Sequence, residues 1–291
     1  MPQYLLAMMI FGTIGLFVRL IDLPSEIIAL ARGGIGAAFL FLLIRVLGRS
    51  IDWEAIRRNL KILLFSGFAL GFNWIFLFEA YRLTSVAAAT LAYYMAPVIL
   101  IVLSPVVLKE RVSPAKFACA GAALFGMSLI CGIWTGETAN LSGILMGLVA
   151  ACFYASLVFA NKFLSPIGPY ESSFTQLAIA AIVLTPYTAF MVDFDSVSLT
   201  TQSLALTLFV AVVHTGLAYW LYFSALPKLE ASRIAIFAYI DPAVAILLSV
   251  FILGEAMTLS GIVGAILILG ATLASELIGL AKKAPQAPQK R

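Results

Sequence analysis

Ten apolar stretches, each about as long as a membrane-crossing helix, account for most of this chain of 291 residues. A helix needs roughly 20 mostly apolar residues to cross about 30 Å of hydrocarbon. The stretches lie near residues 3–20, 26–47, 62–81, 85–107, 114–133, 141–164, 170–191, 203–225, 232–253 and 258–280. A composition with 63% hydrophobic and 11% charged residues is that of an integral membrane protein. Since transmembrane β-strands are shorter and alternate polar with apolar residues, we predict an all-α integral membrane fold with ten transmembrane helices.

The chain also repeats part of its own sequence. Residues 71–110 align with residues 216–255 without a gap, and ten of the forty aligned positions are identical. The pairs of matching proline and glutamate residues are the most informative, because both residue types are scarce here. Each half contains five predicted helices, an odd number, so the two halves must enter the membrane in opposite orientation. We therefore predict two inverted five-helix repeats, residues 1–136 and 137–280, followed by a disordered cytoplasmic tail, residues 281–291.

The positions of Lys and Arg predict the orientation of the chain, because basic loops stay on the cytoplasmic side. With the N-terminus inside, fifteen of the eighteen basic residues fall in cytoplasmic loops or in the tail. We expect a multi-pass protein of the cytoplasmic (inner) membrane with both termini in the cytoplasm. The basic residues form no patch with interleaved aromatic residues, so we expect the lipid bilayer, and not nucleic acid, as a partner.

Two prolines fall near the centres of the predicted fourth and ninth helices. Proline removes an amide donor and disturbs the preceding turn, so we expect both helices to be interrupted or kinked within the membrane. Secondary transporters with inverted repeats place their substrate site where such interrupted helices meet. We assign a helix-breaking role to Pro97 and Pro242. Glu110 and Glu255, which end the same two helices at opposite membrane faces, are expected to act in gating or capping.

Three of the ionisable residues inside predicted helices are candidates for the site, because a charge at a helix centre costs about 2.5 to 3.5 kcal/mol on insertion scales. Asp241 could bind a substrate ammonium or exchange a proton, or it could accept hydrogen bonds from backbone amides freed by the neighbouring proline. His214, the only histidine, suits a proton relay or an interhelical hydrogen bond. Arg32 could face a carboxylate in a cavity, or it could turn toward Asp22 or Glu26.

Neutral polar and aromatic residues complete the predicted site. Asn73 and Gln176 could contact substrate or form hydrogen bonds between helices. Tyr94 and Tyr239 stand at matching places three residues before the paired prolines, and their rings could stack on an aromatic substrate or hold a cation. The predicted central cavity is lined by Asp241, Tyr94, Tyr239, His214, Asn73, Arg32, Tyr154 and Gln176.

These motifs resemble the EamA-type branch of the drug/metabolite transporter superfamily, whose members carry two five-helix units in opposite orientation. The resemblance rests on Tyr94-Met95-Ala96-Pro97 with Lys109-Glu110 in the first half, and on Tyr239-Ile240-Asp241-Pro242 with Gly254-Glu255 in the second. Lys109 departs from the Gly-Glu pair that is usual in the family. The resemblance implies that a substrate moves across the cytoplasmic membrane by alternating access, often in the direction of export.

We therefore expect a secondary active transporter of a small organic metabolite, with export of amino acids or related amphipathic compounds favoured and proton coupling as an option. The alternative is a facilitator or importer of a cationic or aromatic nutrient; a channel or an intramembrane enzyme is less favoured. The sequence lacks the zinc-protease, serine-nucleophile and nucleotide-binding motifs that would indicate catalysis or ATP hydrolysis. We expect no enzymatic activity, no catalytic residue, no metal and no cofactor. The oligomeric state stays open.

Overall fold

The computed structural model describes residues 1–134 and 140–283, and the regular secondary structure within these ranges is entirely helical. Nine stretches in this described part are long and apolar enough to cross a membrane, and Pro114–Ile130 is a shorter apolar helix. The all-α membrane fold class is confirmed, whereas the count of ten and the inverted repeat stay predictions. The predicted boundary at 136/137 and residues 284–291 of the predicted tail lie outside the described residues, and residues 281–283 belong to the last helix.

Seven of the membrane-length or apolar segments are single helices, and three are divided. The single helices are α1 (Pro2–Arg19), α2 (Ser25–Val46), α4 (Leu60–Leu83), α7 (Pro114–Ile130), α8 (Leu141–Asn161), α9 (Pro169–Met191) and α14 (Leu259–Lys283). The divided ones are α5 (Val86–Tyr93) with α6 (Ala96–Val107), α10 (Thr201–Phe209) with the π-helix η2 (Val210–Leu217) and α11 (Ala218–Ala225), and α12 (Ala231–Ala238) with α13 (Ile240–Phe251). Short helices α3 (Trp53–Arg58), η1 (Phe194–Ser196) and η3 (Leu226–Lys228) join them.

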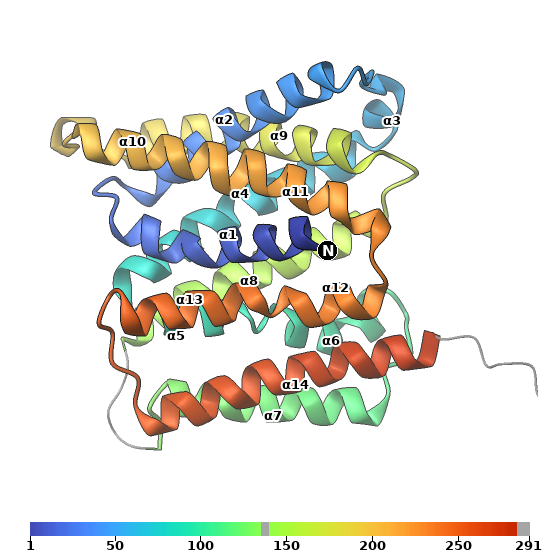
Figure 1. The fold of residues 1–291 in the computed structure, drawn as a ribbon, viewed down its shortest axis with the longest axis vertical. Coiled ribbons are helices and arrows are strands. Elements are labelled where there is room, and N and C mark those ends of the chain that lie inside the picture. Colours follow the sequence, from blue (N-terminus) through green and yellow to red (C-terminus); the bar gives the residue numbers. More distant parts are fainter. Residues whose placement is uncertain (135–139, 284–291) are drawn as a thin grey trace, which may run out of the picture.

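The long helices lie side by side in a stack, with their axes roughly aligned (Figure 1). Helices α2, α9 and α10 lie toward one edge of the stack, and α7 and α14 form the other edge. Between them, α4 packs against α8 and α9, and α1 packs against α13 and α11. Elements from the two halves of the sequence therefore alternate through the core.

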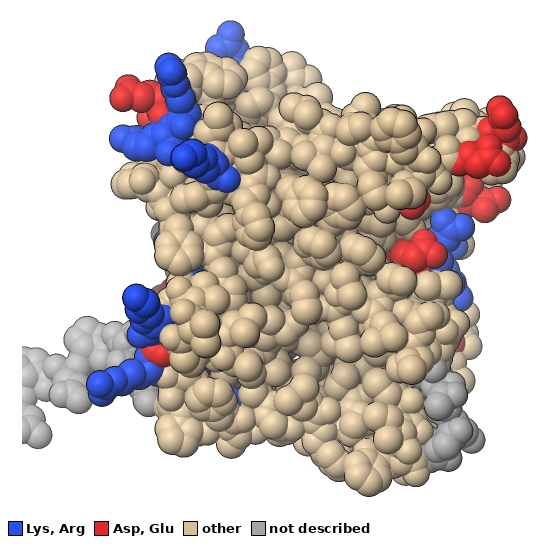
Figure 2. Space-filling model, turned by 180° about the vertical axis from the view of Figure 1, so that it is seen from behind, with Lys and Arg blue, Asp and Glu red and all other residues tan. Residues whose placement is uncertain are grey.

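Charged side chains gather at the two ends of the stack and leave an uncharged band between them (Figure 2). We call the end that carries α3 the basic end, because Lys and Arg predominate there, and the opposite end, where α1 leads into α2, the acidic end. The N-terminus and the last turn of α14 both point to the basic end (Figure 1). The rule for basic residues predicts that the basic end faces the cytoplasm, and this orientation stays a prediction.

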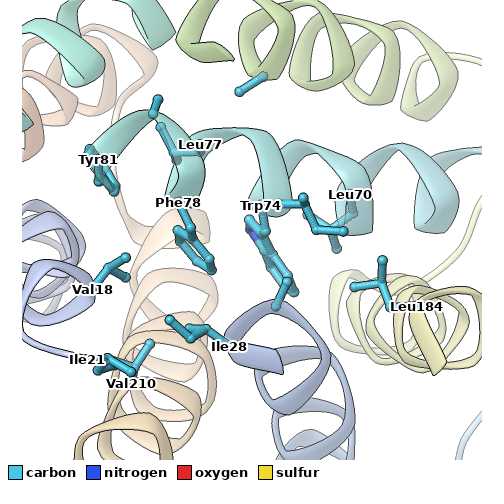
Figure 3. Close-up of a cluster of buried hydrophobic side chains, with 14 of the residues drawn as sticks. Val18, Ile21, Ile28, Leu70, Trp74, Leu77, Phe78, Tyr81, Leu184 and Val210 are labelled. Carbon is cyan, nitrogen blue, oxygen red and sulfur yellow. The ribbon is translucent and has the colours of Figure 1, made fainter. Parts of the chain in front are cut away.

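The largest buried cluster is centred on α4. Leu70, Trp74, Leu77, Phe78 and Tyr81 recur at helical spacing and are all buried. Figure 3 shows Trp74 and Phe78 pointing from α4 in the same direction. Because lipid tails are as apolar as these side chains, van der Waals packing, more than the hydrophobic effect, holds the helices together.

Candidate functional site

Both helices that carry the paired prolines are interrupted. Helix α5 ends at Tyr93 and α6 begins at Ala96, while α12 ends at Ala238 and α13 begins at Ile240. Each proline thus lies in the first turn of the second segment. Proline is tolerated in that place, because the first amides of a helix have no acceptor within the helix.

Asp241 joins the two interrupted helices. It lies in the first turn of α13, and its Oδ2 accepts a hydrogen bond of 3.1 Å from the hydroxyl of Tyr94 at the other interruption. The rings of Tyr94 and Tyr239 lie 6.2 Å apart, so residues from the two halves meet here. Within the described ranges, no backbone amide donates to the Asp241 carboxylate. The alternative in which it binds amides freed by the neighbouring proline is therefore wrong.

Helix α1 contacts α13 directly beside this carboxylate. A Cβ atom at Gly12 would lie 2.5 Å from the Asp241 carbonyl oxygen and 2.7 Å from Val244 Cβ. Only glycine permits so close an approach of two backbones.

A chain of tyrosine rings leads away from Asp241. The centroids of Tyr94 and Tyr93 lie 6.3 Å apart, and those of Tyr93 and Tyr154 lie 5.5 Å apart in edge-to-face geometry. We call Tyr93, Tyr94, Tyr154 and Tyr239 the tyrosine wall. Its faces and hydroxyl groups could hold a cationic or aromatic ligand next to the carboxylate.

Arg32 on α2 is only 4% exposed. Its Nε donates a hydrogen bond of 3.0 Å to the Thr215 hydroxyl, and its Cζ lies 4.1 Å from the ring centroid of Trp74. Among the described residues, no carboxylate lies within ion-pair distance of Arg32. The alternative in which it turns toward Asp22 or Glu26 is therefore wrong.

His214 lies in the π-helix η2, a rare conformation that is frequent at functional sites. Its Nε2 is 2.8 Å from the Thr13 hydroxyl, and that hydroxyl donates to the carbonyl oxygen of Ile10. Since a hydroxyl has one hydrogen to donate, the histidine must donate from Nε2. This is the interhelical bond that was one of the two alternatives for His214. Its Nδ1 is buried and has no hydrogen-bond partner in the described part of the chain.

Asn73 and Gln176 also bond between helices. The Asn73 amide donates to the Ala150 carbonyl at 2.7 Å, which ties α4 to α8. The Gln176 amide donates to the Asn161 side chain at 2.8 Å, which ties α9 to α8. The structure brings neither amide into hydrogen-bond contact with Asp241 or with the Arg32 guanidinium.

Glu255 lies at the acidic end and caps α5. Its Oε2 accepts hydrogen bonds from the Val86 amide at 2.8 Å and from the Ser249 hydroxyl at 2.5 Å. Its Oε1 lies 3.6 Å from Arg19 Nη2. A carboxylate at this place satisfies a free amide of the α5 N-terminus and interacts favourably with the helix dipole.

Glu110 lies at the basic end and is far more exposed. Its Oε1 forms an ion pair of 3.6 Å with Lys162, and the side chains of Lys162 and Glu110 are 48% and 56% exposed. The preceding Lys109 has a φ of +55°, and Gly254, at the matching place before Glu255, has a φ of +67°. The turn before the glutamate is therefore left-handed in both halves, although one half lacks the glycine.

Sequence reasoning missed several polar contacts. Thr13, Thr215 and Ser249 are ordinary residues of apolar helices, and nothing in their spacing predicts their bonds to His214, Arg32 and Glu255. Glu276, on α14, could have been found, because it is an ionisable residue inside the predicted tenth helix. Its side chain is exposed.

Comparison with known proteins identifies the family. The EamA-like transporter family profile matches residues 3–132 and, a second time, residues 141–275. The chain belongs to the EamA-like transporter family. It is similar to the uncharacterized transporter YxxF of Bacillus subtilis, with 31% identity over 256 residues that cover 87% of this chain and 81% of that protein.

The chain is also similar in sequence to more distant proteins. Protein PecM of Dickeya dadantii is 29% identical over 207 residues, which cover 70% of this chain and 68% of PecM. An uncharacterized transporter of Archaeoglobus fulgidus is 27% identical over 235 residues, which cover 79% of this chain and 81% of that protein. A crystal structure with 18% identity superposes with a TM-score of 0.66 and covers 97% of this chain and 98% of its own, which shows the shared fold. The resemblance to drug/metabolite transporters is confirmed.

Proposed function

We propose that this EamA-like transporter is a secondary active transporter that moves a small organic metabolite across the cytoplasmic membrane by alternating access. Export of amino acids or related amphipathic compounds is the activity that we favour. The observation that carries the proposal is the contact between Tyr94 and Asp241, which joins an interrupted helix of one half to that of the other. Interrupted helices at the interface of two repeats are where secondary transporters bind their substrates.

The chemistry of this site favours a ligand that carries an ammonium group. Asp241 offers one carboxylate oxygen beside its bond to Tyr94, and the tyrosine wall supplies hydroxyl groups and ring faces within reach. A carboxylate that is exposed to substrate in a membrane interior can also exchange a proton, which provides an option for coupling export to a proton gradient.

The packing supports a conformation that is open toward the basic end. At the acidic end, α5 packs against α13, and Glu255 fixes the beginning of α5. At the basic end, the described side chains of α12 are exposed or only half-buried, and the described residues form no comparable packing of α12 against α6. With the basic end in the cytoplasm, this conformation would receive substrate from inside the cell.

Export is tested in intact bacteria that express the protein and are fed peptides which release amino acids inside the cell. We expect the wild type to raise the amount of at least one amino acid in the medium above that of a vector control. Asp241→Asn should lower this export roughly tenfold or more, because it removes a charge-assisted contact of about 1.5–3 kcal/mol. The matched control is Asp195→Asn, the same chemical change at an exposed residue of the acidic end, which should export as the wild type does.

Equal export by wild type, Asp241→Asn and the vector control for every metabolite in the medium would contradict the proposal. The second candidate is an importer or facilitator of a cationic or aromatic nutrient. An importer would accumulate labelled nutrient inside cells, and a facilitator would equalise its concentration across the membrane. The tyrosine wall next to a carboxylate is the observation that favours this candidate. The direction of net flux separates the two.

A further inference from the structure

The guanidinium of Arg32 is a buried cation without a buried anion. It is 4% exposed, and among the described residues its only hydrogen bond is the one from Nε to Thr215. Nη1 and Nη2 form no hydrogen bond with the described residues. Removing a charge from water costs several kcal/mol per ion unless a partner compensates it. A structure that keeps such a cation inside the membrane span therefore points to a partner that arrives from outside the chain.

The surroundings of Arg32 hold its guanidinium in one orientation. The Thr215 hydroxyl fixes Nε, while Trp74 lies 4.1 Å and Phe78 5.4 Å from Cζ. A Cβ atom at Gly36 would lie 2.5 Å from Thr215 Cγ2, so α2 and η2 are in close contact at this place. Contacts with aromatic rings stabilise the cation without using its hydrogen-bond donors. The two terminal nitrogens are thus left as a preorganised pair of donors.

A pair of coplanar N–H donors matches the two oxygens of a carboxylate. We propose that Arg32 binds the carboxylate of the transported molecule, with Thr215 and Trp74 as the residues that orient it. This inference rests on the proposed transport function and narrows its substrate class to compounds with a carboxylate.

The test uses phenylglyoxal, which modifies arginine side chains, on the purified full-length protein in detergent. The probe is benzoate, a planar carboxylate, and its neutral isostere benzamide is the control. The extent of modification at each arginine is measured by mass spectrometry of peptides. We expect benzoate to slow the modification of Arg32 roughly tenfold at saturation while leaving Arg45 and Arg49 unchanged, because a charge-assisted pair protects only the arginine that forms it. Benzamide should protect nothing.

Two variants separate binding from folding. Arg32→Lys keeps the charge but loses the planar fork, so it should lose the rise in melting temperature that benzoate gives to the wild type. Thr215→Val keeps Arg32 and removes only the hydroxyl that orients it, and it should weaken benzoate binding roughly fivefold. Arg82→Lys, a matched change at an exposed arginine, should behave as the wild type.

Three results would overturn the assignment: an Arg32 that does not react under any condition, equal protection by benzoate and benzamide, or equal protection by chloride or phosphate. If one of them occurs while the wild type exports and Asp241→Asn does not, the carboxylate site is wrong and the proposed function stands. If benzoate protects Arg32 but no export is found, the anion site stands and the proposed function fails.

Discussion

At the acidic end Glu255 is enclosed, whereas at the basic end Glu110, which stands at the matching place in the repeat, is open. The Glu255 side chain is 14% exposed and binds the Val86 amide, the Ser249 hydroxyl and Arg19. The Glu110 side chain is 56% exposed and has an ion pair with Lys162. Two similar sequences thus form a tight contact at one end and a loose contact at the other.

This difference has a physical meaning in the proposed mechanism of alternating access. If both glutamates capped the opposite half in the same conformation, the central site would be closed at both ends. The Glu255 contacts would instead stabilise the state that is closed at the acidic end, and Glu110 would make the corresponding contacts after the switch. A ligand can shift such an equilibrium only through its different affinity for the two states.

Removing the Glu255 carboxylate should have the largest effect on the difference between the two ends, because it should open the acidic end. Glu255→Ala removes a half-buried ion pair and two hydrogen bonds. The conformation that is closed at the acidic end should lose about 3 kcal/mol of stability. In a variant that lacks the native cysteines, a cysteine placed at Val86, which is 1% exposed, reports the opening. Its labelling rate with a membrane-impermeant maleimide should rise roughly 100-fold.

The matched variant is Glu110→Ala on the same background. Because an exposed ion pair contributes about 0–1 kcal/mol, labelling at position 86 should change less than about fivefold. Equal labelling rates in the two variants would show that Glu255 does not hold the acidic end closed. The inferred difference between Glu255 and Glu110 would then be wrong.

The sequence predicted the helices well because their signal is local. The stretch near 26–47 is observed as α2 (Ser25–Val46), and that near 62–81 as α4 (Leu60–Leu83). An interruption or kink in the helices that carry Pro97 and Pro242 was also predicted, since proline cannot continue the hydrogen bonding of the turn before it.

The parts that could not be predicted depend on contacts between distant segments. The π-helix around His214 has the same apolar composition as an α-helix, so hydropathy gives no signal for it. The position of Arg32 depends on Thr215, a partner 183 positions away along the chain. The difference between Glu110 and Glu255 belongs to one conformation of the protein, and a repeated sequence can only predict that the two are alike.

A smaller effect is expected where α1 meets α13. The first helices of the two halves align at a spacing of 143, which places Phe11-Gly12 opposite Tyr154-Ala155, so the alanine methyl group is already present in the second half. Gly12→Ala would place Cβ 2.5 Å from a backbone oxygen, which must move, and should cost about 2 kcal/mol. Ala155→Gly should cost about 1 kcal/mol through helix propensity alone. The melting temperature in detergent measures both, and a Gly12→Ala variant as stable as the wild type would refute the close contact beside Asp241.

The smallest effect concerns the left-handed turns before the two glutamates. Lys109 adopts a φ that is costly for any residue with a Cβ atom, whereas Gly254 adopts a similar φ without that cost. Lys109→Gly should therefore stabilise the protein by about 0.5 kcal/mol, after the added entropy of glycine in the unfolded chain offsets part of the gain. Gly254→Lys should destabilise it by about 1 kcal/mol, and since nothing lies within 4 Å of a Cβ atom at Gly254, backbone strain alone would be the cause. The turns are far apart, so in the double variant the two changes should add to a net loss of about 0.5 kcal/mol, measured by the melting temperature. A loss of stability in Lys109→Gly would mean that the lysine side chain contributes more than its backbone costs, and that the two turns are alike only in shape.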